Sequence, residues 1–213
     1  LVDAAVVVDG VLRVCPATPY SKGAAWFERP QRVDAGFVTR FAFQFTQQQQ
    51  LGGDGFAFVI QDHARDAIGS VYGGALGYSD WPECGPGGIP SSLAVEFDLW
   101  RNVEWDDPDD NHISVHTRGT GPNCAHERAS IGRTSAIPDL HTEDVHVVTI
   151  RYEPHPGRLT ISMDDASAPV LSVPVDLVST LGLTNGRAFV GFTAGTGQEV
   201  QAHDILDWVF VEG

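Results

Sequence analysis

A short stretch of the chain concentrates side chains that can donate to a metal ion. Glu96 and Asp98 lie two residues apart, and Asn102, Asp107 and His112 follow closely. Residues two apart in a β-strand point to the same face, so we expect the carboxylates of Glu96 and Asp98 to face the same way. Carboxylate, amide and imidazole groups at this density indicate a metal site.

The mixture of donors indicates two different ions. Calcium takes about six to eight oxygen ligands, and one carboxylate can serve two cations, so Asp98 and Asp107 could bridge a pair of ions. Asn102 offers an amide oxygen, and the backbone carbonyl of Trp100 can complete such a shell. His112 indicates a transition metal, because imidazole with carboxylates suits manganese better than calcium. We therefore expect Ca²⁺ together with Mn²⁺ or another transition metal.

Two alternatives bear on this interpretation. Most Asp and Glu side chains are solvated, and any one of these acids could be so. For the set, burial of Glu96 and Asp98 on an otherwise apolar strand without a counter-charge would cost several kcal/mol. The second alternative is that Asp106 replaces Asp107 as the bridging ligand, and the residue types leave that choice open.

The residues around these donors predict the elements that position them. Val95, Phe97 and Leu99 alternate with the acids and are expected to point into a core, whereas Trp100 shares the acidic face. Apolar runs are short, rich in Val, Ile, Phe and Thr, and separated by Gly and Pro, which predicts an all-β sandwich. We expect strands over residues 38–45, 55–60, 93–100, 113–116, 145–152, 159–163, 189–192 and 205–211, with a hairpin turn at 153–157.

Composition narrows the possible classes of protein. A chain of 213 residues with 42% hydrophobic content can form a single domain over residues 1–213. The formal charge of −15 argues against nucleic-acid partners and suits cation binding. No apolar run approaches the roughly 20 residues of a membrane span, so we expect no membrane insertion. Residues 1–4 lack the start of a secretory signal, so we expect a mature or excised domain.

The cysteines leave two readings open. Cys15, Cys84 and Cys124 are an odd number, and a Cys84–Cys124 disulfide is one reading, while three free thiols are the other. Weak calcium sites stay loaded most easily outside the cell, which favours a secreted or cell-surface protein.

The segment from Val95 to His112 resembles the metal-binding core of the L-type (legume-type) lectins, a resemblance that favours Asp107 over Asp106. Further matches to that family lie at residues 53–58, 73–77, 190–194, 196–197, 203–206 and 208–210, so it covers nearly the whole chain. The resemblance implies a jelly-roll-like antiparallel β-sandwich of the concanavalin A-like type, with a flat and a curved sheet. It also implies metals that hold the loops of a sugar site and do no chemistry.

The resemblance further implies a set of sugar contacts. Asp54 and Asn102 would hydrogen-bond ring hydroxyls, and the backbone N–H of Gly74 would approach the sugar closely. Trp100 would stack on the apolar face of a pyranose. The Gly53–Asp54 peptide would be cis. Gln198 could donate its backbone N–H, and the length of the loop at residues 196–203 favours mannose or glucose.

Other functions are possible for a chain with these residues, and some of its features are atypical of legume seed lectins. Glu96 and Asp98 superficially fit a glycosidase pair, but metal-bound carboxylates are poor proton carriers. A structural adhesion or spacer domain that has lost sugar binding is another alternative. Three cysteines and the absence of an Asn-Xaa-Ser/Thr site are atypical of seed lectins, which favours a non-plant, glycan-binding module of a larger multidomain chain. His116 and His203 are expected to lack clustered partners and to have no ligand role.

Overall fold

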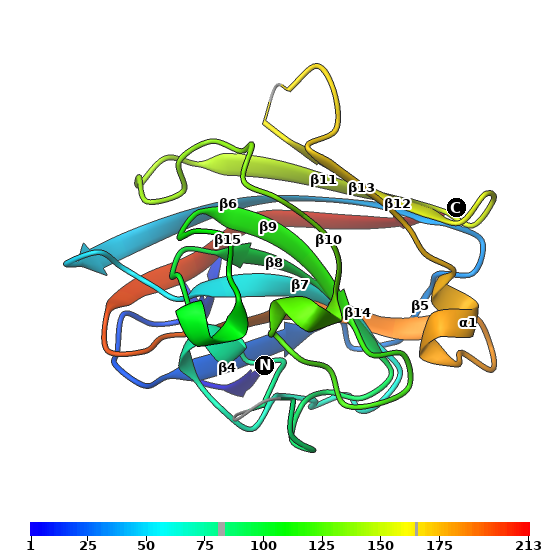
Figure 1. Ribbon diagram of the computed structural model, residues 1–213, viewed down its shortest axis with the longest axis horizontal. Coiled ribbons are helices and arrows are strands. Elements are labelled where there is room, and N and C mark those ends of the chain that lie inside the picture. The colour runs from blue at the N-terminus through cyan, green and yellow to red at the C-terminus, as the bar shows by residue number, and fades with distance from the viewer. Residues whose placement is uncertain (81–83, 165) are drawn as a thin grey trace.

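The computed structural model describes residues 1–80, 84–164 and 166–213. It contains two antiparallel β-sheets packed face to face (Figure 1). Within the described residues one sheet is eight-stranded. Its strands run in the order β1 (Val2–Asp3), β4 (Lys22–Trp26), β14 (Arg187–Gly195), β7 (Gly55–Gln61), β8 (Ser92–Asp98), β9 (His112–Thr117) and β10 (Ser130–Thr134), with β5 (Gln31–Arg32) paired to β14.

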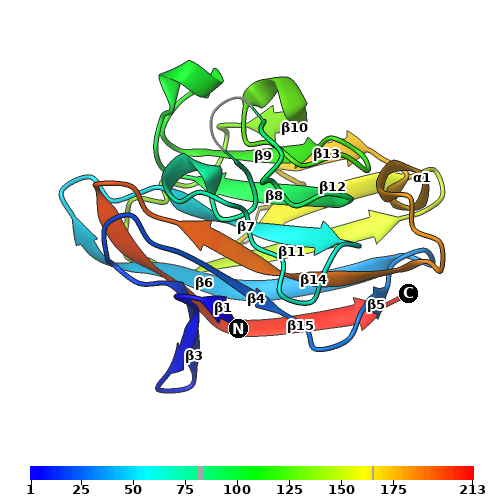
Figure 2. The same ribbon diagram turned by 90° about the horizontal axis from the view of Figure 1, so that it is seen from below.

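The second sheet has seven strands in the part of the chain described. Their order is β13 (Leu171–Pro174), β12 (Arg158–Met163), β11 (His146–Glu153), β6 (Phe37–Gln49), β15 (Val200–Glu212), β3 (Val11–Cys15) and β2 (Val6–Val8). This nearly all-β two-sheet sandwich confirms the expected fold class. The β2–β3 hairpin projects from the body of the sandwich (Figure 2).

An aromatic core lies between the sheets, because alternate residues of the central strands point inward. In β6 the buried positions include Phe37, Phe41, Phe43 and Phe45. Phe41 is at the centre of this core, with ring contacts to Phe43, Phe56, Phe58, Phe97 and Phe192. The predicted inward positions Val95, Phe97 and Leu99 all belong to the same cluster.

All eight expected strands are present, with ends that differ by a few residues. Strand β8 ends at Asp98 and not at residue 100, so Trp100 lies in the following loop. The hairpin between β11 and β12 is also present. Several strands were not predicted, namely β1, β2, β3, β4, β5, β10 and β13. Most of these are short and lack clear alternation, which explains why the apolar pattern does not reveal them.

Helical structure is sparse. The short helix α1 (Leu177–Leu181) begins after Asp176, whose side chain accepts a hydrogen bond from Ser179 N at 3.1 Å, and ends at Gly182 in the left-handed conformation. Among the described residues, no helix combines the length and apolar character that a membrane crossing needs.

Loops and 3₁₀ turns cover the outer face of the eight-stranded sheet. The turns are η1 (Gly73–Ala75), η2 (Val103–Trp105) and η3 (Glu127–Ala129), and η2 and η3 lie close together beside β8 and β9 in both views (Figures 1 and 2). A second buried cluster, which includes Tyr78 and Trp105, packs on Ala57 and Ala94 of this outer face. The fold therefore has a small outer core between this sheet and its loops.

A disulfide joins two of these loops. Cys84 bonds to Cys124 across 40 residues of sequence, and Cys15 is a buried free thiol. This pairing answers the question that the cysteine count left open. It also anchors the segment that leads into η3.

Removal of this disulfide should destabilise the protein. We expect the Cys84→Ser/Cys124→Ser double variant to lose about 2–4 kcal/mol in unfolding free energy, measured by denaturant titration, because the unfolded chain regains loop entropy. In the wild-type protein, a thiol reagent added in denaturant without reductant should detect one free thiol, that of Cys15. Detection of three free thiols would contradict the pairing.

Candidate metal centre and ligand pocket

The pairing of β8 with β9 brings the predicted donors of two strands together. Glu96 lies opposite Ser114, and Asp98 lies opposite His112. Because cross-strand partners share a face, all four side chains lie on the outer face of the sheet. All four are buried, the carboxylates of Glu96 and Asp98 included.

The turn η2 supplies the next carboxylate. Asp106 closes η2 in the left-handed conformation with φ 64°, and its side chain is 78% exposed. The following residue, Asp107, is 5% exposed and points into the buried cluster. The geometry therefore brings Asp107, and not Asp106, to the other donors.

A further carboxylate joins the cluster from η3. The cluster contains two groups of three possible ligands, and within each group the ligand atoms lie within 4.8 Å of one another. Both groups include His112: one adds Glu96 and Asp98, and the other adds Asp107 and Glu127. Glu127 was not predicted. It is remote in sequence from the other acids and follows a cysteine-containing loop, so no strand alternation signals its position.

The carboxylate of Glu96 is already hydrogen-bonded by protein groups. Tyr78 Oη donates to one oxygen, and Ser114 Oγ donates to the other at 2.7 Å. His116 Nε2 lies 2.9 Å from that second oxygen, and His116 Nδ1 is 3.0 Å from Cys124 O. The expectation that His116 lacks clustered partners is therefore wrong. His112, Ser114 and His116 alternate along β9, and this period of two could have indicated their shared face.

Burial by itself shifts the pKa values of Glu96 and His116 in opposite directions. Burial opposes the charged form of Glu96, but the attraction of His116 and three hydrogen bonds outweigh it and lower the pKa of that carboxyl. Burial also opposes the charge of His116, yet Glu96 raises the pKa of its ring. The two groups thus favour an ion pair. His203 is a separate case, because burial lowers its pKa to about 3 and keeps it neutral.

The other two carboxylates are electrostatically frustrated. Burial, followed by the charges of Asp107 and Glu96, raises the pKa of Asp98 well above its usual range. Burial and the charge of Glu96 likewise raise the pKa of Asp107 to about 8. Close, desolvated carboxylates repel one another unless a proton or a cation separates them. The pair therefore has the electrostatics of a cation site.

Unpaired polar atoms support the same interpretation. Among the residues that the structure describes, both ring nitrogens of His112, Oε1 of Glu127 and Oδ1 of Asn102 are buried without a hydrogen-bond partner. Buried polar atoms without partners are costly and rare in folded proteins. A set of hard oxygens with one imidazole fits a calcium ion beside a transition-metal ion. The residues present thus fit the two expected ions.

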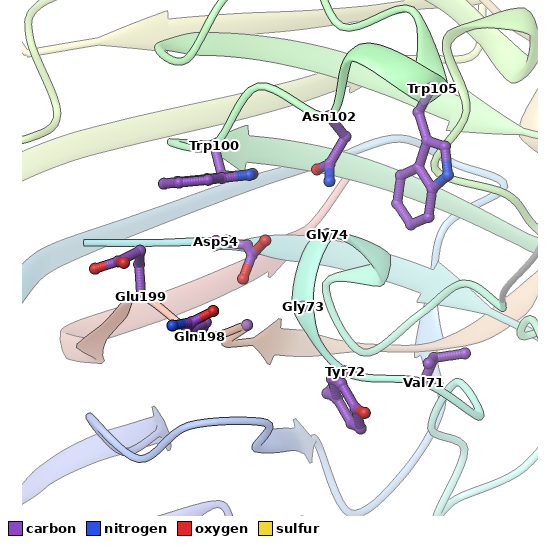
Figure 3. Close-up of a pocket in the computed structure, with 11 residues that line it drawn as sticks. Asp54, Val71, Tyr72, Gly73, Gly74, Trp100, Asn102, Trp105, Gln198 and Glu199 are labelled. Carbon is purple, nitrogen blue, oxygen red and sulfur yellow. The ribbon is translucent and has the colours of Figure 1, made fainter. Parts of the chain in front are cut away.

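A pocket of about 460 Å³ lies beside this cluster (Figure 3). The structure brings all five predicted sugar-contact residues to its wall: Asp54, Gly74, Trp100, Asn102 and Gln198. The side chains of Asp54 and Asn102 point toward the same space, with Trp100 at one side and Gly74 at the other (Figure 3). Sequence reasoning missed other residues of the wall, among them Tyr72, Trp105 and Glu199. Tyr72 directly precedes the predicted Gly73–Gly74 segment, which was the available signal.

Close contacts define the floor of the pocket. The Gly53–Asp54 peptide is cis, as expected. Burial raises the pKa of Asp54 to about 7, and a hydrogen bond from the Gly197 backbone partly offsets this. A Cβ atom at Gly74 would lie 2.3 Å from Asn102 Oδ1, so a side chain at this position would collide with the amide. The glycine thus allows η1 to approach the loop that carries Asn102.

Two hydrogen bonds connect the pocket to the buried carboxylates. Trp100 N donates to Asp98 Oδ1 at 2.8 Å, and Asn102 N donates to Asp107 Oδ2 at 2.7 Å. The backbone of Leu99 also donates to Asp54 O at 2.8 Å. The carboxylates of Asp98 and Asp107 thus hold the backbone of two residues that line the pocket.

Known proteins are similar to this chain in sequence and in fold. The legume lectin domain family matches residues 1–213. In Arabidopsis thaliana, the probable L-type lectin-domain containing receptor kinase VII.2 is 30% identical over 223 residues, which cover 94% of this chain and 31% of the kinase. Lectin 8 of Medicago truncatula is 30% identical over 207 residues, covering 91% of this chain and 72% of that lectin.

Solved structures agree with these relatives. The lectin from Bauhinia forficata in complex with GalNAc has a TM-score of 0.80 and 26% identity, covering 98% of this chain and 90% of that chain. The present chain spans less than a third of the length of the receptor kinase that it matches.

The carboxylate cluster predicts how stability depends on pH without metal. In chelator, the unfolding free energy should fall as pH rises from about 7 to 9. The folded pKa of Asp107, about 8, lies above its unfolded value near 3.9, so the stability that its proton contributes is lost as pH rises through the folded value. The folded pKa values of His112 and His203 are lowered, so these residues change stability in the opposite direction. They do so only below their unfolded pKa of about 6.5, which lies below this pH range.

Thermal and denaturant unfolding at each pH would measure this slope. Addition of Ca²⁺ and Mn²⁺ should restore stability at the alkaline end, and Asp107→Asn should flatten the slope in chelator because its amide does not titrate. Equal slopes for the wild type and Asp107→Asn would contradict the assignment.

Proposed function

This chain belongs to the legume lectin domain family, and on that basis we propose that residues 1–213 form one metal-dependent domain that binds a glycan without chemically changing it. The observation that carries the proposal is the convergence of Asp54, Gly74, Trp100 and Asn102 on one pocket whose loop is tied to a buried carboxylate cluster. The fold brings these residues together from three separate segments of the chain.

The two ions share the donors Asp98 and Asp107 and differ in the rest. We assign Ca²⁺ to Asp98, Asp107, Asn102 Oδ1 and the carbonyl of Trp100. We assign Mn²⁺, or another transition metal, to Glu96, Asp98, Asp107 and His112. When bound, the cations supply positive charge between carboxylates that would otherwise repel one another. The unpartnered oxygen of Asn102 and ring nitrogens of His112 support these assignments.

The pocket residues are suited to a pyranose. Asp54 would accept hydrogen bonds from ring hydroxyls, and the Asn102 amide nitrogen would donate another, which leaves its oxygen available to hold calcium. Trp100 offers an aromatic surface to the C–H face of the ring. Gly74, and more peripherally the exposed Gln198, present backbone N–H groups. A shallow pocket of this kind gains few buried contacts, so affinity for one monosaccharide is expected near millimolar.

The absence of catalysis is part of the proposal. Glu96 and Asp98, the residues that a glycosidase would need, are buried and do not line the pocket. Glu96 accepts hydrogen bonds from the hydroxyls of Tyr78 and Ser114. Asp98 accepts one from the backbone of Trp100. The carboxylates of the described pocket wall are Asp54 and Glu199.

The relatives of this chain and its disulfide bond support a biological setting for the domain. We propose an extracellular or cell-surface domain within a longer chain, with glycans or glycoconjugates as partners and a role in glycan recognition or adhesion. The Cys84–Cys124 disulfide supports an oxidising compartment. The receptor kinase relative supports a larger chain. For the sugar itself, loop length favours mannose or glucose, whereas the relative in complex with GalNAc favours a galactose-type sugar.

A glycan array tests the proposal. Binding should require added Ca²⁺ and Mn²⁺, disappear in chelator, and identify the sugar among mannose, glucose, galactose and GalNAc probes. At about pH 8, above the pKa of about 7 of Asp54, Asp54→Asn should weaken binding by more than about tenfold, because a hydrogen bond to a charged group contributes about 1.5–3 kcal/mol and 1.4 kcal/mol corresponds to a factor of ten.

The matched control is Asp9→Asn, which removes an exposed carboxylate at the β2–β3 turn and should leave binding unchanged. Binding that survives both chelation and Asp54→Asn would refute a metal-organised site. Metal uptake without binding to any glycan would instead support a structural adhesion domain.

A further inference from the structure

Glu127 occupies an unusual position at the start of η3. Its side chain is 4% exposed, and Arg133 Nη1 donates to Oε2 at 2.8 Å. The other oxygen, Oε1, lies 3.7 Å from His112 Nε2 and 3.8 Å from His116 Nε2, and it is buried without a hydrogen-bond partner in the described part of the chain. Arg133 thus holds one oxygen of Glu127, and the other oxygen points into the donor cluster.

These separations are those of ligands that share an ion. Both distances exceed the roughly 3.2 Å limit of an N–H···O hydrogen bond, so neither histidine satisfies the oxygen directly. Donors that each lie about 2.0–2.2 Å from one transition ion are at most about 4.4 Å apart. The 3.7 Å between Oε1 and His112 Nε2 falls within that limit. Asp107, His112 and Glu127 also form one of the two donor groups within 4.8 Å.

We propose that Glu127 is a direct ligand of the transition-metal ion, in addition to Glu96, Asp98, Asp107 and His112. This inference rests on the proposed metal dependence and extends it by one protein ligand.

The negative charge of Glu127 and the contacts that hold its carboxylate in place both favour this role. Glu127 adds a fourth buried carboxylate to those of Glu96, Asp98 and Asp107, and its negative charge favours cation binding even though His116 and Arg133 offset part of it. Arg133 acts on the outer oxygen of Glu127 and fixes the orientation of the carboxylate, as hydrogen bonds to metal ligands commonly do. The Cys84–Cys124 disulfide fixes the chain three residues before Glu127.

Manganese titration of the calcium-saturated protein tests the proposal. Free Mn²⁺ would be measured by electron paramagnetic resonance for the wild type, Glu127→Gln and Glu127→Ala. Both variants should bind Mn²⁺ at least about tenfold more weakly, since the loss of an outer-shell partner alone costs about 10–100-fold. The matched control is Asp106→Asn, which removes an exposed carboxylate near the cluster and should leave the affinity unchanged.

A count of bound water separates a ligand from a nearby charge. In a six-coordinate shell, five protein ligands leave one water on Mn²⁺, and four leave two. Water-proton relaxation should therefore report one inner-sphere water in the wild type and a second in Glu127→Ala. The wild-type count stands even if both variants fail to fold.

Three outcomes would overturn the proposal. The first is two waters in the wild type, and the second is an affinity loss no larger than that of Asp106→Asn. The third is weaker binding of Glu127→Ala with an unchanged water count, which would make Glu127 a charge near the ion and not a ligand. Wild-type protein that binds no Mn²⁺ would refute this inference and the proposed metal dependence together, whereas the first three outcomes leave the proposed function intact.

Discussion

The repulsion between two buried carboxylates is the constraint on which the ligand pocket depends. Asp98 and Asp107 are desolvated, and the charge of Asp107 raises the pKa of Asp98, while the charge of Glu96 raises the pKa of both. Each also accepts a hydrogen bond from the backbone of a pocket residue, Trp100 or Asn102. The same oxygens thus repel one another and fix the wall of the pocket. Under the proposed metal dependence, a cation between them would change the repulsion into attraction and would couple pocket geometry to ion binding.

The sandwich supplies the rigidity that this arrangement needs. Phe41 and its aromatic neighbours fill the space between the sheets, and strand alternation leaves the opposite face of β8 for polar groups. A second, smaller core that includes Tyr78 and Trp105 excludes water from that outer face. The burial of the acids, and hence their perturbed pKa values, is a consequence of this layer of loops. The disulfide fixes one edge of the layer at Cys124.

Local patterns in the sequence predicted the main strands and the donors of β8, and the resemblance to the L-type lectins predicted the pocket residues, but neither predicted every member of the cluster. Alternation in β8 is visible because apolar and acidic residues take turns, and the separation of Asp98 from His112 matches a strand, a loop and a strand. Glu127 could not be found this way, since its place depends on how η3 folds back over β9. The choice between Asp106 and Asp107 likewise depended on a left-handed turn that residue types do not specify. His116 was underestimated because its partner, Glu96, lies on another strand.

A crystal structure grown with Ca²⁺ and Mn²⁺, with anomalous diffraction collected at the manganese edge, would show whether cations lie between Asp98 and Asp107. We expect two separate ions, both in contact with these two carboxylates, with the manganese signal on the side of His112 and calcium on the side of Asn102. Density for neither ion between these carboxylates, with the loop of Trp100 and Asn102 nevertheless in the same conformation, would contradict this expectation. The pocket would then be held by protons on the acids and not by cations.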